Sequence, residues 1–430
     1  MTPAQLVEGV LVSLGQLIPN TRIRQQIEAA PPLTSSGFQV TEGRNVRLWF
    51  CPGPDQEPLV ISLEREMGLT DREMDLLRLV PPAIAELSSA GSQAFLGLGL
   101  KFSNKIGFGD LLVARFLDPE KADPEGLRIG LLAVLQDLSF RYYEDKRCSS
   151  GFCFTSDLEA FTAALSASGF LYSPFETPVD FHYDLFSSPA SFRYVDGRNS
   201  YYVVDAQLKL HGIVRLKNPD QYSLVARLRN QHLKGLLAGM PGQPWVAFVG
   251  LREEVFVIVS PEVQLKWSRN HWQLRDRSLL FTLLARFGLA TDLQELLVSL
   301  FFALSEGGLG ASILIPEDSA VLPTAIGKID HTEVGDHLRA LIQKQHIAEL
   351  NATNSLLGIV SSDGLTTISR DGRILRCGDI IDISRAALLQ SQGGGRSQAG
   401  IAASFFGLSI KISQNGPVSF WHRGELLLQF

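Results

Sequence analysis

The sequence has few cysteines and lacks several motifs that define common enzyme classes. Its 430 residues include four cysteines, and the two that lie closest together, Cys148 and Cys153, have no histidine or further cysteine nearby. Four cysteines are too few for a disulfide scaffold of this size, so we expect reduced thiols and no zinc site. No HExxH, GxSxG or Walker A motif occurs, so the chain gives no sign of the enzyme classes that those motifs identify.

Long apolar runs and an excess of positive charge are also missing. A membrane helix needs roughly 18 to 20 uninterrupted apolar residues, and the apolar segment 293–304 is interrupted by Gln294, Glu295 and Ser299. The N-terminus has no basic segment before its apolar residues, which argues against a signal peptide. The net charge of −6 gives no general attraction to nucleic acid. We therefore expect a cytoplasmic protein with neither a membrane nor a nucleic acid as partner.

What is present indicates a folded protein of several domains. Hydrophobic residues make up 45% of the chain and charged residues 20%, which is ordinary for a globular protein. The length suggests two or three domains. We expect an α/β (mixed α+β) fold with a mixed α/β region over 1–175, a β-rich region over 176–285 and a third domain over 286–430.

Local patterns predict the elements of the first two regions. Apolar spacing predicts a helix over 5–17, and Thr70 with Glu73 forms a capping box that predicts a helix start. Asp196-Gly197 is typical of a hairpin turn. The strands expected in this part of the chain cover 191–195, 201–204, 208–216, 245–250, 255–260 and 263–274.

Two tryptophans in the last of these strands, Trp267 and Trp272, have Arg269 and His271 between them. Such a ladder can stack nucleic-acid bases, but aromatic residues on a sheet are far more often part of a core. We expect packing.

The last third of the chain alternates helices and strands. A capping box of Thr291 and Gln294 predicts a helix that ends at Gly307-Gly308. The apolar run 356–361 is expected to be a buried strand that ends at Asp363-Gly364, and Asp371-Gly372 is a hairpin turn. The other expected elements are strands at 311–315, 366–369, 374–376, 408–413 and 418–421 and helices at 333–350 and 398–406.

The end of the chain is similar to an earlier segment. Residues 410–428 and 257–275 share a pattern of apolar residues, serine, tryptophan and arginine. Either an internal duplication or two hairpins of similar composition explains the similarity.

Two segments of the last third have residues suited to a nucleotide. Gly393-Gly394-Gly395 before a helix presents backbone N–H groups without Cβ interference, and Arg396 adds a charged fork for phosphate oxygens. Ser397 contributes a hydroxyl or caps the helix. Asp363 in a tight turn suits Mg²⁺ or a ribose hydroxyl. The alternatives are a solvated surface loop and an ordinary hairpin turn.

These segments resemble the diadenylate cyclase superfamily, the domain found at the N-terminus of the bacterial DNA integrity scanning protein. The resemblance covers about Thr291 to Phe430, roughly one third of the chain. Its four landmarks, in order, are GGLGASILI at 307–315, SDGLTTIS at 362–369 in place of the family's DGA motif, RDGRIL at 370–375, and QGGGRSQAGIAASFFGLSIKISQNGPVSFW at 392–421 in place of its GTRHR motif, helix and hairpin.

The resemblance implies a mixed, seven-stranded sheet flanked by helices. It also implies a homodimer in which each ATP's 3′-hydroxyl attacks the other's α-phosphate, with a DGA aspartate near the hydroxyl and the metal. Asp363 and Gly364 match this motif, and Leu365 replaces its alanine. Of the family's Arg-His-Arg triplet only Arg396 remains.

The chain therefore lacks part of the charged residues that the family uses in catalysis. Two donors to the leaving pyrophosphate are lost, which we expect to cost a hundredfold or more in rate. The segment 399–413 contains no carboxylate, and Asp379 or Asp382 would have to replace the family's acidic residue. This pattern resembles divergent, sensor-type members of the superfamily, in which a cyclase-like domain follows a long N-terminal region.

We therefore expect a sensor of ATP or a cyclic dinucleotide. Its expected nucleotide-binding residues are Asp363, Gly364, Leu365, Gly393, Gly394, Gly395, Arg396 and Ser397. The first alternative is an active diadenylate cyclase with Asp363 as catalytic residue and ligand of Mg²⁺ or Mn²⁺. The second is a scaffold without a ligand.

Overall fold

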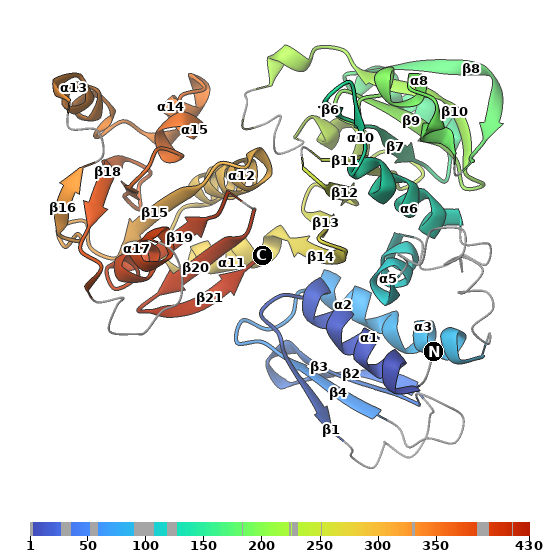
Figure 1. Cartoon of the computed structure of the whole chain (residues 1–430), viewed down its shortest axis with the longest axis horizontal. Coiled ribbons are helices and arrows are strands. Elements are labelled where there is room, and N and C mark those ends of the chain that lie inside the picture. The colour runs from blue at the N-terminus through green and yellow to red at the C-terminus, as the bar shows by residue number, and fades with distance from the viewer. Residues whose placement is uncertain are drawn as a thin grey trace. The chain divides into compact units, whose positions relative to one another are not determined.

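The chain forms two compact units (Figure 1). The computed structural model describes residues 3–26, 36–51, 59–89, 107–117, 127–182, 184–222, 225, 231–250, 252–328, 332–384, 395–414 and 416–430. The first unit comprises Met1–Asn218 and Leu233–Asp276, and the second comprises Pro219–His232 and Arg277–Phe430. The expected division between 175 and 176 falls inside a strand of the first unit. Each unit has sheets flanked by helices, so the mixed α/β class is confirmed.

The first unit begins with a small antiparallel sheet of order β1-β4-β3-β2. Its strands are β1 (Arg22–Gln26), β2 (Ser36–Thr41), β3 (Asn45–Phe50) and β4 (Leu59–Glu64), and its helices are α1 (Pro3–Leu17), α2 (Asp71–Arg78) and α3 (Val80–Ser89). The predicted first helix is confirmed. The predicted capping box is also confirmed: Thr70 Oγ1 accepts from the Glu73 amide at 3.2 Å, and Glu73 Oε2 accepts from the Thr70 amide at 2.7 Å.

A larger sheet follows, with the order β14-β13-β12-β11-β7-β9-β10-β8. Its strands are β7 (Gly151–Phe154), β8 (Phe170–Asp180), β9 (Ser200–Val204), β10 (Lys209–Leu216), β11 (Trp245–Val249), β12 (Glu254–Ile258), β13 (Val263–Ser268) and β14 (His271–Asp276). The other elements of this part are α5 (Phe108–Leu117), α6 (Leu127–Ser139), β5 (Tyr142–Tyr143), β6 (Lys146–Arg147), α7 (Leu158–Ala164), α8 (Ala190–Arg193) and α10 (Lys234–Leu237). Among the described pairs, β7 and β9 are parallel and the other neighbours antiparallel.

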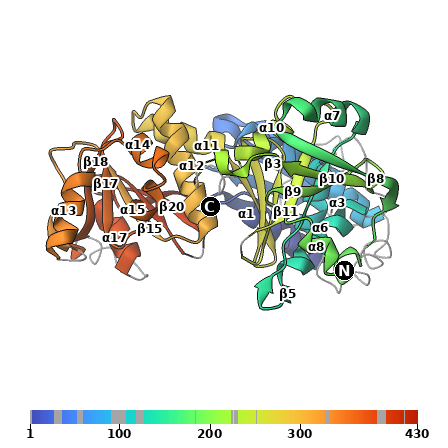
Figure 2. The same cartoon turned by 90° about the horizontal axis from the view of Figure 1, so that it is seen from above.

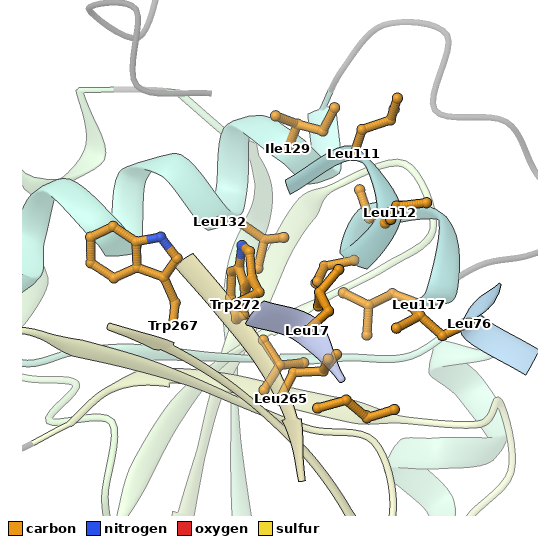
Figure 3. Packing of buried hydrophobic residues seen from close by; sticks show 14 of the residues in the cluster. Leu17, Leu76, Leu111, Leu112, Leu117, Ile129, Leu132, Leu265, Trp267 and Trp272 are labelled. Carbon is orange, nitrogen blue, oxygen red and sulfur yellow. The ribbon is translucent and has the colours of Figure 1, made fainter. Parts of the chain in front are cut away.

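Both tryptophans of the suspected ladder belong to the core. Trp267 and Trp272 are 4% and 2% exposed, and Figure 3 shows their rings among apolar side chains from α1, α5 and α6. The Trp272 indole N–H donates to Asp110 Oδ1 at 2.8 Å, and burial raises the pKa of this carboxyl although four hydrogen bonds oppose the shift. The packing prediction is confirmed.

Two predictions in the first unit are wrong. Residues 191–195 were expected to form a strand, but 190–193 form helix α8, and Asp196-Gly197 connects this helix to β9 without forming a hairpin. The segment 263–274 forms two strands instead of one, because Arg269 and Asn270 adopt the left-handed conformation, with φ of 51° and 65°, and turn the chain. The prediction for 263–274 was right about the strand conformation and missed the turn inside the segment.

The second unit contains a seven-stranded mixed sheet of order β16-β18-β17-β15-β19-β20-β21. Its strands are β15 (Ala311–Pro316), β16 (Ala325–Lys328), β17 (Leu365–Ile368), β18 (Ile374–Ile381), β19 (Gly407–Ile412), β20 (Val418–His422) and β21 (Glu425–Gln429). Its helices are α11 (Arg277–Arg286), α12 (Thr291–Gly307), α13 (Glu333–Ile342), α14 (Ile347–Ala352), α15 (Leu356–Val360) and α17 (Gly395–Ala403). Strands β15 and β17 are parallel.

Helices α12 and α17 cover opposite faces of this sheet. Phe301 of α12 meets the ring of Phe420 on β20 at 5.5 Å, whereas the core cluster under α17 includes the next residue, Trp421. Successive side chains of a strand point to opposite faces. Figures 1 and 2 both show α17 against β15.

Several local predictions in the second unit are corrected. Ala290 rather than Thr291 is the N-cap of α12, and the Gln294 amide donates to the Leu289 carbonyl at 2.6 Å. The helix ends at Gly308 with φ of 68°, as predicted. The expected helix over 333–350 is divided into α13 and α14, because the Lys344 amide donates to the Ile374 carbonyl of β18 at 2.8 Å.

The most consequential correction concerns the apolar run 356–361. It was expected to be a strand, but it forms helix α15. A short apolar run does not distinguish a buried strand from a buried helix. Asp363-Gly364 therefore lies before a strand, β17, and not at the end of one.

Candidate functional site

The Asp-Gly turn between α15 and β17 is fixed by a close backbone contact. Gly364 has φ of +91°, and a Cβ built on it would lie 2.7 Å from the Gly378 carbonyl carbon. Only glycine combines that conformation with so close an approach. Asp363 is exposed and Leu365 is buried, so the turn presents its carboxylate outward while its leucine enters the core.

The Asp-Gly turn packs against a β-bulge in β18. Leu365 pairs with Asp379, but Thr367 pairs with Arg376, so β18 has one extra residue between these two pairs. Gly378, with φ of 72°, lies in this bulge. Bulges next to strand ends re-aim side chains, and here the bulge places Asp379 beside the start of β17.

A row of residues crosses the sheet at the level of the turn. The cross-strand partners form the sequence Lys411, Ser312, Leu365, Asp379, Lys328, from β19 through β15, β17 and β18 to β16. The row combines two lysines, a serine and a carboxylate, which are residue types that are mostly exposed in proteins. The row therefore marks a polar zone at the end of the sheet where β17 begins.

Helix α17 brings its first turn to the same zone. A Cβ built on Gly400 would lie 3.6 Å from Lys411 Cβ and 3.7 Å from Ser409 Oγ, so the helix runs over β19. Lys411 Nζ donates a hydrogen bond to Ser397 Oγ in the first turn of α17. Leu365 shares a core cluster with Ile401 of the same helix.

The structure thus brings some of the predicted site residues together. Leu365 is the middle member of the row and Asp363 and Gly364 directly precede it, while Ser397 is joined to the row through Lys411. Gly395 is the first residue of α17. The predicted residues Gly393 and Gly394, and the side chain of Arg396, lie outside the described part of the chain.

The electrostatics of the row follow from its burial. Lys411 is half-buried, and desolvation lowers the pKa of its amine. Asp379 is 6% exposed; desolvation raises the pKa of its carboxyl, against the opposing effects of Arg376, Lys328 and Arg339. The zone therefore combines several cations with a carboxylate that is costly to ionise.

Lys411 is the residue that the sequence analysis missed. It belongs to no motif. Its signal was a lysine within GLSIKI, where the flanking Ile410 and Ile412 are fully buried. A charged residue in so apolar a strand indicates either a partner or a ligand.

The described residues do not form a metal centre of protein ligands alone. No group of three or more histidine, cysteine, aspartate or glutamate side chains in them is placed to hold an ion. Of the two alternative carboxylates, Asp379 is part of the row, whereas Asp382 accepts from the amide and hydroxyl of Ser384 in the loop after β18. The four cysteines are free thiols.

Comparisons with known proteins give little further information. No family model matches the chain, and no curated protein matches it. A solved structure described as a hypothetical membrane spanning protein from Bacillus cereus is similar at 18% identity and a TM-score of 0.23, over 30% of this chain. The match spans 59% of that structure's chain. Among the described helices, none has the length and apolar character needed to cross a membrane.

Proposed function

We propose that the second unit binds a nucleotide or cyclic dinucleotide and that the protein is a sensor with a degenerate, diadenylate-cyclase-like domain. The observation that carries the proposal is the Lys411 contact, because it links the first turn of α17 to the row that contains the Asp363–Leu365 turn. The mixed seven-stranded sheet flanked by helices supports it as well, because the resemblance implies that arrangement.

The chemistry of the zone suits a phosphate. The first N–H groups of a helix have no partner within the helix, and its dipole favours an anion there. A half-buried ammonium beside this end adds a charge-assisted donor. Asp363 on the neighbouring turn is exposed, and a carboxylate suits a ribose hydroxyl.

The test is titration of the pure protein with cyclic di-AMP and with ATP and Mg²⁺ by isothermal calorimetry. Removing a charge-assisted hydrogen bond costs about 1.5 to 3 kcal/mol, so we expect Lys411→Met to weaken binding by about 10- to 100-fold. Lys344→Met is the matched control, because Lys344 is exposed in the turn between α13 and α14. Equal affinity of the two variants would contradict the role of Lys411.

The second candidate is a working diadenylate cyclase with Asp363 as its catalytic carboxylate. Mg²⁺ or Mn²⁺ would then depend on the substrate's phosphates for most of its ligands, since the row itself supplies few carboxylates. Incubation with ATP and either metal, followed by mass spectrometry, distinguishes enzyme from sensor. Cyclic dinucleotide that disappears in Asp363→Asn would establish the enzyme.

Two further parts of the proposal have direct tests. A homodimer through the second unit predicts twice the chain mass in light scattering. The scaffold alternative predicts that no nucleotide changes the melting temperature, whereas a bound ligand raises it.

A further inference from the structure

The large sheet of the first unit repeats the strand order of the second unit. Without its edge strand β14, its order is β13-β12-β11-β7-β9-β10-β8, and the order in the second unit is β21-β20-β19-β15-β17-β18-β16. Replacing β7 to β13 by β15 to β21, in chain order, converts one into the other. Every strand occupies the same place in both sheets.

The pairing senses agree as well. The pair β7–β9 is parallel, as is its counterpart β15–β17, and the remaining neighbours in both sets are antiparallel. Helices precede corresponding strands, since α6 (with β5 and β6 after it), α8 and α10 come before β7, β9 and β11, and α12, α15 and α17 come before β15, β17 and β19.

The registers match next to the turns of the β9–β10 and β17–β18 hairpins, and β18 has a second extra residue, at Gly378, that β10 lacks. Val204 pairs with Leu210 across a five-residue connection, and Ile368 pairs with Ile374 across another. In each hairpin the second strand then has one extra residue before the next pair, which is Val203–Gly212 or Thr367–Arg376.

The conformations of these turns agree too. Leu208 and Gly372, the fourth residues of the two connections, both have positive φ, at 59° and 83°. Their amides donate to the carbonyls of Asp205 and Ser369, at 3.0 and 2.9 Å. Two hairpins of similar composition do not require such agreement.

The connection into the second strand of each set contains an Asp-Gly pair. Asp196-Gly197 leads from α8 to β9, and Asp363-Gly364 leads from α15 to β17. Both glycines have positive φ, at 67° and 91°. The sequence similarity between 257–275 and 410–428 instead aligns β12–β14 with β19–β21, one strand out of this register.

The polar row has an apolar counterpart in the first unit. With the registers above, Lys411, Ser312, Leu365, Asp379 and Lys328 correspond to a second row whose members are Phe248, Gly151, Tyr201, Val214 and Tyr172. None of the five residues in this second row is charged, and three of them are aromatic.

Aromatic side chains fill the place where the second unit has its polar zone. A Cβ built on Gly151 would lie 2.8 Å from Phe248 Cβ and 2.9 Å from Tyr201 Cδ1, and the two rings pack edge to face at 6.3 Å. Burial is the main cause that raises the pKa of the Tyr201 hydroxyl well above its usual value. The Phe248 and Tyr201 side chains thus occupy the positions that correspond to Lys411 and Leu365.

The aspartate of the first unit is used by its own turn. Asp196 Oδ1 accepts from the amides of Arg198, Asn199 and Ser200 at 2.8 to 2.9 Å and from the Ser200 hydroxyl at 2.9 Å. Although desolvation opposes them, these hydrogen bonds lower the pKa of the carboxyl. Asp196 therefore holds the connection to β9 in shape.

We infer that the chain contains two copies of one sheet domain and that the copies have divided their roles. The first copy has become a structural domain with a closed aromatic core, and the second alone retains a polar row for a phosphate-bearing ligand. Resting on the proposed function, this inference predicts one ligand per chain, bound by the second copy.

Paired variants test the division of roles. We expect Asp196→Ala to lower the melting temperature by about 4 to 8 °C, since it removes several hydrogen bonds, and to leave the affinity for cyclic di-AMP or ATP with Mg²⁺ unchanged. Asp363→Ala should lower that affinity about tenfold and reduce the melting temperature less. Calorimetry of the full chain should give a stoichiometry of one.

The outcomes separate the two proposals. Two ligands per chain, one of them lost in Asp196→Ala, would overturn the division of roles. No binding by any variant would overturn the proposed function. The melting temperatures alone would then test the role of Asp196, and an equal decrease in melting temperature in the two variants would contradict a structural role for Asp196. A solved structure in which β7 to β13 do not superpose on β15 to β21 would overturn the duplication.

Discussion

Replacing Gly364 by alanine tests the contact on which the candidate site is built. The new methyl group would lie 2.7 Å from the Gly378 carbonyl carbon and 2.9 Å from its Cα, and both are backbone atoms that cannot rotate away. A left-handed conformation costs a non-glycine residue about 1 to 3 kcal/mol, and forcing a methyl group into a packed contact costs about 1 to 3 more. We therefore expect a loss of about 2 to 6 kcal/mol in the free energy of unfolding.

A matched variant exists in the same unit. Gly358 lies inside α15, and a Cβ built on it meets nothing within 4 Å. Gly358→Ala should therefore stabilise the chain by about 0.4 to 1 kcal/mol, because alanine restricts the unfolded chain.

The assay is differential scanning calorimetry of the full chain with each variant. At about 2 to 4 °C per kcal/mol for a unit of this size, Gly364→Ala should melt at least 4 °C below the wild type and Gly358→Ala slightly above it. Calorimetric titration with cyclic di-AMP should show weaker binding in Gly364→Ala alone. Identical melting of the two variants would refute the reasoning, because it would mean that the turn does not rest on Gly378.

Three further predictions concern buried polar groups. Desolvation raises the pKa of Asp379 in the folded chain, so ionisation of this carboxyl costs stability as pH rises through that pKa. Asp379→Asn should therefore raise the melting temperature at pH 7, and the gain should vanish below about pH 4. A gain that does not depend on pH would contradict this prediction. Lys411→Met should raise the melting temperature of the ligand-free protein at pH 7, since the charged amine is half-buried, and a loss would show that its bond to Ser397 outweighs desolvation. Trp272→Phe should lower the free energy of unfolding by about 2 to 4 kcal/mol, because Asp110 loses a buried donor; urea denaturation measures this, and a change below 1 kcal/mol would contradict it.

Local signals predicted the elements whose shape depends on neighbouring residues. The helix 5–17, the Thr70 capping box and the Asp371-Gly372 turn follow from adjacent side chains and were correct. Long-range contacts decided the failures. The break near Lys344 depends on a carbonyl of β18 thirty positions away, and no local pattern records it.

The geometry of the candidate site was predicted in part for the same reason. Asp363, Gly364 and Ser397 were named as candidates because glycine turns and helix starts have sequence signatures. Lys411 and Asp379 were placed beside them by strand register, which a single sequence does not specify. The duplication was hidden because substitutions such as Phe248 for Lys411 changed the chemistry of the row while the pairing of the strands remained.

The contact between Gly364 and Gly378 has a mechanical consequence. The two backbones meet there with no side chain between them, so no flexible side chain can adjust when one backbone moves relative to the other. A ligand that pulls on the turn must therefore shift β18 with it, and β18 is paired to β16 and packed against α13. Ligand binding at the turn would in this way move the edge strand β16 as part of a rigid body.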